Sequence, residues 1–154
     1  MTGFYKVDRR AVFTADGFYP TNDLVRIDAD GYLFFVARRR DMIKTNSANV
    51  SRLEVEAALN ALPDVALSLV AGLPDAELGE MVAAAVVPAP GANPTADELR
   101  AALRERLSSF KIPRRIVFIT DDDVPRTPTG KIRLFDVAQM IDSRLADSAP
   151  APAP

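Results

Sequence analysis

The chain has 154 residues, 48% hydrophobic and 26% charged, which is the balance of an ordinary soluble globular polypeptide with one core domain. A net charge of -2 excludes a dedicated nucleic-acid binder, because binding to a phosphate backbone needs a concentrated positive field. The lack of cysteine and histidine excludes disulfides, cysteine zinc sites, thiolate nucleophiles and the commonest general base. With no signal peptide and no apolar run of membrane-spanning length, we expect a cytoplasmic protein without a membrane span.

The first forty residues predict strands joined by turns. Turn signals at residues 15–17 (ADG) and 28–31 (DADG) surround the apolar run at residues 32–36 (YLFFV). A β-hairpin is the simplest interpretation of this segment.

From Ser51 the pattern becomes helical. Ser51 with Glu54 predicts a capping box, and apolar residues at 55, 58, 59 and 62 share one helix face before Pro63 ends it. The apolar runs 66–71 and 81–87, separated by a loop at 72–79, predict an antiparallel strand pair. A second capping box, Thr95 with Glu98, opens another helix, and residues 115–119 predict a third strand.

These elements predict an α+β fold, with a small three-stranded antiparallel sheet and flanking helices, preceded by the β-hairpin. The end of the chain alternates alanine and proline, which offer few backbone donors and little apolar side chain to pack. We therefore expect residues 144–154 to form a disordered tail.

Three loops carry a family resemblance. They are residues 19–24 (YPTNDL), residues 37–44 (ARRRDMIK) running on to 49–56 (NVSRLEVE), and residues 124–132 (VPRTPTGKI). In this order and spacing they resemble the carboxy-terminal end of the adenylate-forming enzymes: acyl-CoA synthetases, luciferases and peptide-synthetase adenylation domains. The resemblance covers about residues 3–140. It implies that residues 1–38 are a β-hairpin remnant of the amino-terminal adenylation domain, 39–41 the hinge, and 42–143 the carboxy-terminal lid domain.

Lys131 follows a glycine turn, and by itself a Thr-Gly-Lys triplet indicates only a surface turn; it is not a Walker loop, which needs a longer glycine-rich run. The resemblance implies that Lys131 is the catalytic lysine of adenylation. In that reaction a carboxylate attacks the α-phosphorus and expels pyrophosphate, so a fixed ammonium would stabilise the charge on the phosphate oxygens.

Asp23 lies in a loop, where an aspartate by default forms a turn. The resemblance implies that its carboxylate accepts hydrogen bonds from the two ribose hydroxyls of ATP, and that Arg38 is the other ribose-side residue. Asn22 and Ala37 stand where the family has glycine. Asparagine tolerates a positive φ best among the other residues, so we expect the loop to keep its shape at Asn22.

The polar run at residues 38–41 would by itself be a solvated connection. The resemblance makes Arg40 the hinge residue, whose backbone angles change as the two domains rotate. It also implies that Lys44 faces the active site in the thioester-forming conformation. The following loop would line the tunnel for the pantetheine arm of CoA, where Ser47 replaces a glycine and adds bulk in the path of the thiol.

Residues 110–115 (FKIPRR) have two interpretations. In the first, the cations complement the dipole of a preceding helix end, and the sequence favours this interpretation no less than the second. The resemblance instead implies that Lys111 and Arg114 contact the phosphates of the CoA nucleotide.

Two hypotheses follow. In the first, the chain is the catalytic lid of an ATP-dependent acyl-CoA synthetase of fatty acid metabolism. It would use a carboxylic acid, ATP and CoA or a carrier-protein thiol, with Mg²⁺ bound through the amino-terminal domain. No Ser/Thr/Gly-rich phosphate loop occurs here, so we expect no activity without that domain. In the second, the chain is a non-catalytic interaction module or relic of the same fold. Retention of Asp23, Arg38, Lys44 and Lys131 favours the first hypothesis.

Overall fold

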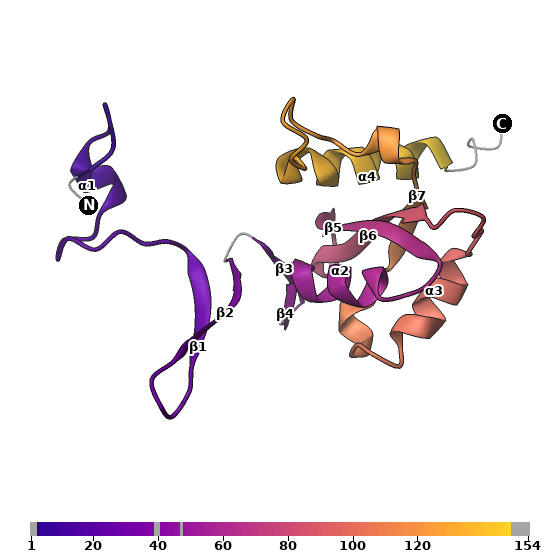
Figure 1. Ribbon diagram of the computed structural model, residues 1–154, viewed down its shortest axis with the longest axis horizontal. Coiled ribbons are helices and arrows are strands. Elements are labelled where there is room, and N and C mark those ends of the chain that lie inside the picture. Colours follow the sequence, from indigo (N-terminus) through magenta and orange to yellow (C-terminus); the bar gives the residue numbers. More distant parts are fainter. Residues whose placement is uncertain (1–2, 39–40, 47, 149–154) are drawn as a thin grey trace. The chain divides into compact units, whose positions relative to one another are not determined.

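The computed structural model describes residues 3–38, 41–46 and 48–148 (Figure 1). The chain divides into two compact units, Met1–Asp41 and Met42–Pro154, which are described separately below. Arg40, Ser47 and residues 149–154 of the expected tail lie outside the described residues.

The first unit contains the expected hairpin. Strands β1 (Asp23–Ile27) and β2 (Leu33–Arg38) pair antiparallel, with Asp23 opposite Arg38. A short helix, α1 (Arg9–Val12), precedes them and was not expected. The Asp28 carboxylate closes the hairpin turn by accepting hydrogen bonds from the backbone N–H groups of Asp30 and Tyr32.

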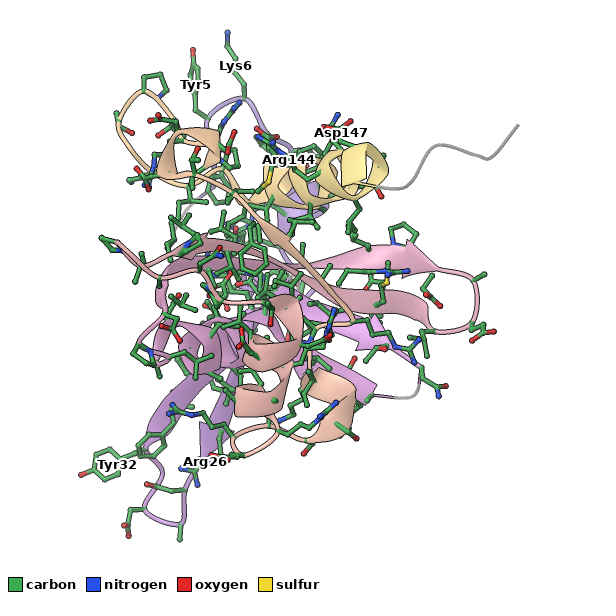
Figure 2. All side chains as sticks on the ribbon, turned by 90° about the vertical axis from the view of Figure 1, so that its right-hand side faces the viewer. Tyr5, Lys6, Arg26, Tyr32, Arg144 and Asp147 are labelled. Carbon is green, nitrogen blue, oxygen red and sulfur yellow. The ribbon has the colours of Figure 1, made fainter. Side chains whose placement is uncertain are left out.

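This hairpin exposes large apolar side chains on both strands. Leu33 is 67% exposed and Phe35 57%, although a soluble hairpin would normally cover such side chains. Figure 2 shows Tyr32 projecting from the turn. The unit therefore carries an apolar surface that it does not bury by itself.

The second unit holds one sheet and three α-helices among its described residues. In chain order its elements are β3 (Met42–Thr45), β4 (Ala48–Ser51), α2 (Arg52–Asn60), β5 (Val65–Asp75), β6 (Gly79–Pro88), α3 (Ala96–Leu103), β7 (Arg115–Phe118) and α4 (Leu134–Ser148). Two short 3₁₀ turns, η2 (Ser109–Lys111) and η3 (Asp121–Asp123), lie on either side of β7 in the sequence.

The α+β class is confirmed, but the expected three-stranded antiparallel sheet is wrong in two respects. The sheet has five strands in the order β4-β3-β6-β5, with β7 also paired to β6. Strands β3 and β4 have only four residues each, too few for a clear alternation pattern. Strand β7 runs parallel to β6. The segment between them, which contains α3, is long enough to return the chain to the end of the sheet where β6 begins.

Each face of the sheet has its own hydrophobic core. On β6, Val82, Ala84 and Val86 belong to the cluster formed with α2 and α3, whereas Ala83 and Ala85 belong to the cluster formed with α4. This is the alternation of side chains along a strand that is buried on both faces. Figure 1 shows α2 and α3 on one side of the sheet and α4 on the other.

Helix α4 corrects the expected end of the folded domain. Val137 and Ile141 are buried in the second cluster, and Leu145 packs against it, so the apolar stripe recurs every four residues. Residues 144–148, which the alanine and proline content assigned to the tail, are therefore the last helical residues of α4.

Candidate functional site

The first candidate site surrounds Asp23 and Arg38 at the open end of the hairpin. Strand pairing places the two residues opposite each other, and Arg38 Nε lies 3.0 Å from Asp23 Oδ1. They line a pocket of about 380 Å³ together with Tyr19, Thr21 and Asn22. The structure thus brings together the two residues that the sequence predicts on the ribose side of ATP.

The loop before Asp23 keeps the shape that asparagine was expected to allow. Asn22 has φ 59°, in the left-handed region where glycine is usual, so this expectation is confirmed. The backbone N–H of Asp23 donates to Thr21 Oγ1 at 3.3 Å, which tightens the turn. The carboxylate of Asp23 thereby stands at the start of β1, at the edge of the pocket.

The second candidate site begins at Lys44 on β3. The side chain of Lys44 is exposed between the buried residues Ile43 and Thr45, as alternation along a strand requires. Asn46, two residues after Lys44, has φ 53° and donates its backbone N–H to Leu78 O at 2.7 Å. The loop after Lys44 is thus anchored on the β5–β6 hairpin.

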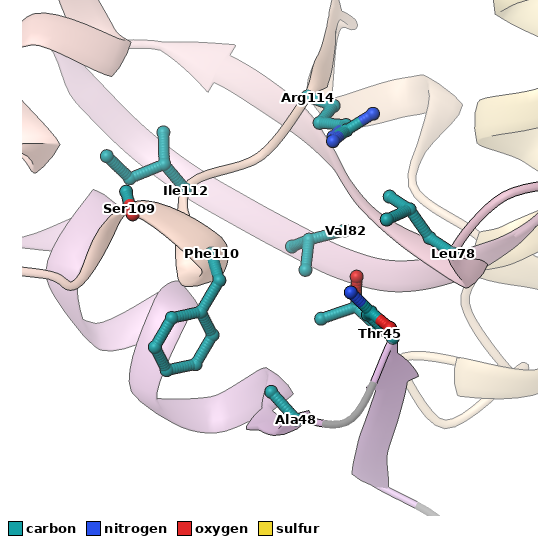
Figure 3. Close-up of a pocket in the computed structure, with 9 residues that line it drawn as sticks. Thr45, Ala48, Leu78, Val82, Ser109, Phe110, Ile112 and Arg114 are labelled. Atoms are coloured by element: carbon teal, nitrogen blue, oxygen red, sulfur yellow. The ribbon is translucent and has the colours of Figure 1, made fainter.

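A pocket of about 590 Å³ opens beside this loop. The residues that line it include Thr45, Asn46, Ala48, Phe110 and Arg114. Figure 3 shows Phe110 and Thr45 on either side of Val82. The ring of Phe110 suits a planar ring of a ligand, and the guanidinium of Arg114 suits an anionic group.

Phe110 and Asn46 are pocket residues that the sequence did not single out. Phe110 belongs to the segment at 110–115, but only its two cations were considered there. An aromatic residue directly before a run of basic residues was the available signal for Phe110. For Asn46 the signal was weaker, since an asparagine in a turn needs no function.

Lys111 and Arg114 occupy different surroundings. Arg114 lines the pocket, whereas the Lys111 ammonium donates to Glu54 Oε1 at 2.6 Å and so ties η2 to the start of α2. Glu54 had been expected to complete a capping box with Ser51. Ser51 Oγ accepts the Glu54 backbone N–H at 3.4 Å, while the carboxylate of Glu54 pairs with Lys111.

Lys131 closes a narrow turn before α4. The backbone N–H of Thr127 donates to the Lys131 carbonyl at 2.7 Å, and the Lys131 N–H donates to Thr127 Oγ1 at 3.1 Å. Gly130 has φ 81°, which a glycine adopts without strain. The exposed Lys131 side chain is therefore carried by a turn whose backbone is fixed on both sides.

Ion pairs brace the base of this turn. Arg126 pairs with Asp121, and Arg144 of α4 pairs with Asp123 of η3. The backbone N–H and the hydroxyl of Thr120, followed by the Arg144 guanidinium, hold the pKa of Asp123 below its ordinary value. The turn is thus attached to both η3 and α4.

The Lys131 turn and the pocket belong to opposite faces of the sheet. Val124 and Ile132, which flank the turn, pack in the cluster with α4. Val82 and Ile112, which line the pocket, pack in the cluster with α2 and α3. The second unit therefore presents the Lys131 turn on one side of its sheet and the pocket lined by Arg114 on the other.

Neither a metal site nor a membrane helix is found in the described parts of the chain. No group of three or more Asp or Glu side chains there is arranged to hold a metal ion. Among those same residues, no helix is both long and apolar enough to span a bilayer.

Residues 54–131, just over half of the chain, match the family described as the AMP-binding enzyme C-terminal domain. The chain belongs to this family.

Individual relatives agree with the family match. The chain is 39% identical over 123 residues to an oxalate–CoA ligase of Arabidopsis thaliana, covering 80% of this chain and 24% of the relative. It is 43% identical over 125 residues to the fatty acid–[acyl-carrier-protein] ligase ScoC of Streptomyces coeruleorubidus, covering 81% and 24%.

A solved structure has a similar fold. ATP-bound MatB from Rhodopseudomonas palustris matches with a TM-score of 0.74 at 35% identity, over 84% of this chain and 25% of MatB. The chain therefore spans about a quarter of the length of the relatives it matches.

Proposed function

We propose that this chain is the catalytic lid of an ATP-dependent acyl-CoA synthetase, which adenylates a carboxylic acid and then forms a thioester with CoA. The observation that carries the proposal is the placement of the Lys131 turn and of the pocket beside Lys44 on opposite faces of one sheet. Two half-reactions at one active site require the lid to present one face and then the other. A two-faced unit after a hinge at Arg40 meets that requirement.

In the first half-reaction Lys131 would face the α-phosphate of ATP. Its ammonium stabilises the negative charge that gathers as pyrophosphate leaves, and the fixed turn holds it there without reorganisation. Asp23 would accept the ribose hydroxyls, with Arg38 holding the carboxylate in place at 3.0 Å. Mg²⁺ would accompany the phosphates on the adenylation domain.

In the second half-reaction the loop after Lys44 and the pocket beside it would face the active site. The pantetheine arm would pass the loop that contains Ser47, and the nucleotide of CoA would lie in the pocket against Phe110 and Arg114. Lys111 would serve the same phosphates only after leaving Glu54, so Arg114 is the stronger candidate. A carrier-protein thiol is the alternative acceptor, since ScoC, by its name, acts on an acyl carrier protein.

The two half-reactions can be measured separately in the complete enzyme, meaning this chain together with its adenylation domain. Lys131→Ala should reduce pyrophosphate exchange by about 100- to 1000-fold, as removal of a preorganised electrostatic group does, and spare thioester formation from preformed acyl-adenylate. Lys44→Ala should show the opposite pattern. Equal losses in both assays for both variants would contradict the two-face proposal.

The alternative is a non-catalytic interaction module or relic of the same fold. It would be favoured if no adenylation domain is encoded with the chain, and if the chain has no effect when added to one. The preserved left-handed turn at Asn22 and the intact Asp23–Arg38 pair support the catalytic proposal, because drifting loops have no need to keep either.

A further inference from the structure

The loop after Lys44 is held in place by a side chain in addition to backbone hydrogen bonds. Among the described residues, β3 is paired to β6 only through Thr45 and Gly79. At the preceding residue, the backbone N–H of Lys44 donates to Glu80 Oε2 at 2.6 Å, so a carboxylate takes the place of a strand carbonyl. This bond fixes the point from which the Lys44 side chain projects.

Gly72 on β5 leaves the room that this carboxylate occupies. A Cβ at Gly72 would lie 3.1 Å from Glu80 Oε2 and 3.0 Å from Ile43 Cγ2, closer than nearly all real contacts of that kind. Gly72 and Val82 are opposite each other, and Glu80 lies two residues before Val82 on the same face of β6. Glu80 therefore reaches Lys44 on the face of the sheet that carries the pocket.

The acceptor of this bond is a carboxylate, although the bond lies in an exposed region. A backbone N–H that donates to an ionised carboxylate forms a charge-assisted bond, about twice as strong as a neutral one. Yet the Lys44 N–H lies in an exposed region, where water would satisfy the donor if the carboxylate were absent. The bond is thus better suited to fixing the loop than to satisfying a buried group.

We infer that Glu80 is a positioning residue for the thioester-forming step, which it serves by orienting Lys44. This inference rests on the role proposed above for Lys44. A shift of about 1 Å at such a position costs on the order of 100-fold in rate, because the reacting groups lose their alignment. Glu80 itself need not touch CoA or the acyl-adenylate.

The kinetic test compares Glu80→Ala and Glu80→Gln with Glu77→Ala in the complete enzyme. Glu77 is a matched control, because it is an exposed glutamate in the turn of the same β5–β6 hairpin. We expect Glu80→Ala to slow single-turnover thioester formation by about 10- to 100-fold with pyrophosphate exchange within twofold. Glu80→Gln should retain part of the rate, since an amide oxygen still accepts, and Glu77→Ala should change neither step.

A double-mutant cycle separates positioning from a general structural role. If Glu80 acts through Lys44, then Glu80→Ala should cause no further loss of transfer in a Lys44→Ala background. Additive losses, or equal losses in both half-reactions, would overturn the inference. A structural role alone predicts those outcomes together with a lowered melting temperature.

Hydrogen exchange on the 154-residue chain tests the geometry without any assay of activity. In Glu80→Ala the Lys44 amide should exchange at least about tenfold faster, while the amides of β5 keep their protection. An unchanged Lys44 amide would overturn the inference. If instead that amide exchanges faster but Lys44→Ala leaves transfer intact, the proposed role of Lys44 fails while Glu80 still holds the loop.

Discussion

At the scale of single residues, the Asp23–Arg38 pair shows how local geometry orients the carboxylate that we propose to contact the ribose. The pair joins the first residue of β1 to the last residue of β2, and the side chain of Asp23 is only 29% exposed. The left-handed turn at Asn22 directs the carboxylate to the edge of the pocket rather than back into its own loop. A carboxylate held by one cation still offers oxygens that accept two hydroxyl groups.

Asp23→Asn should therefore weaken ATP binding in the complete enzyme. Hydrogen bonds to a charged group are worth about 1.5 to 3 kcal/mol, so the KM for ATP should rise by roughly 10- to 100-fold in steady-state kinetics. Asp30→Asn, at an exposed position in the hairpin turn, is the control and should leave KM unchanged. The same KM in both variants would mean that Asp23 only shapes its loop.

At the scale of elements, helix starts and turns in the second unit depend on side chains that accept backbone N–H groups. Thr95 and Glu98 form a reciprocal capping box at α3, and Thr120 and Asp123 form another at η3. The Asp75 carboxylate accepts the N–H groups of Glu77 and Leu78 in the turn of the β5–β6 hairpin. These bonds define where each element begins.

Thr95→Ala should lower the free energy of unfolding by about 1 kcal/mol, the usual cost of removing an N-cap hydroxyl. Chemical denaturation of the 154-residue chain measures this value. Ser143→Ala serves as the control, because its hydroxyl donates to Gln139 O within α4 and such a bond adds little to a helix. A loss no larger than that of the control would show that α3 is held by packing of Leu99 and Leu103 alone.

The same acceptors make the second unit sensitive to acid. The N–H groups of Leu78 and Glu77 lower the pKa of Asp75, and the N–H and hydroxyl of Thr95 lower the pKa of Glu98. A carboxyl whose pKa is lower in the folded state stabilises it above the unfolded pKa, and this stabilisation is lost as pH falls through the folded pKa.

We therefore expect a flat free energy of unfolding from about pH 8 to pH 6 and a decline below about pH 4, the ordinary range of carboxyl groups. Denaturation at a series of pH values measures the decline. Asp75→Asn should show a smaller decline, because its side chain no longer titrates. A free energy that stays level down to about pH 3 would contradict this view.

At the scale of the whole molecule, the two units differ in how well each buries its own apolar surface. The second unit closes two clusters around one sheet, with Leu59 and Ile141 fully buried. The first unit is a two-stranded hairpin with a short helix, and a two-stranded sheet alone is marginally stable in water. We therefore expect the second unit to be more stable than the first.

Hydrogen exchange and solution mass of the isolated chain should show this inequality. We expect slow exchange within residues 42–141 and fast exchange within residues 3–36, or self-association through the hairpin edge. Leu33→Ser with Phe35→Ser should lower the self-association and leave the protection of β5 and β6 unchanged. Uniform protection of a monomer from the first residues onward would show that the hairpin is covered within the chain itself.

The sequence by itself determined the local elements and the family. Ser51 and Thr95 mark helix starts because a cap depends on neighbours three residues away. The hairpin at β1 and β2 followed from short-range turn signals. The three loop motifs, including those of Asp23 and Lys131, led to the family because their spacing is a property of the chain rather than of its folding.

Only the tertiary structure decided which distant segments meet. Strand β7 pairs parallel with β6 through a crossover connection, which local patterns do not encode. Nor do they encode which face of the sheet α4 covers. The bond from Lys44 to Glu80 joins residues 36 positions apart through one side chain and one backbone group, so no periodicity announces it. Long-range contacts are selected by the packing of the whole core, and for that reason the sequence predicted the candidate residues but not their neighbours.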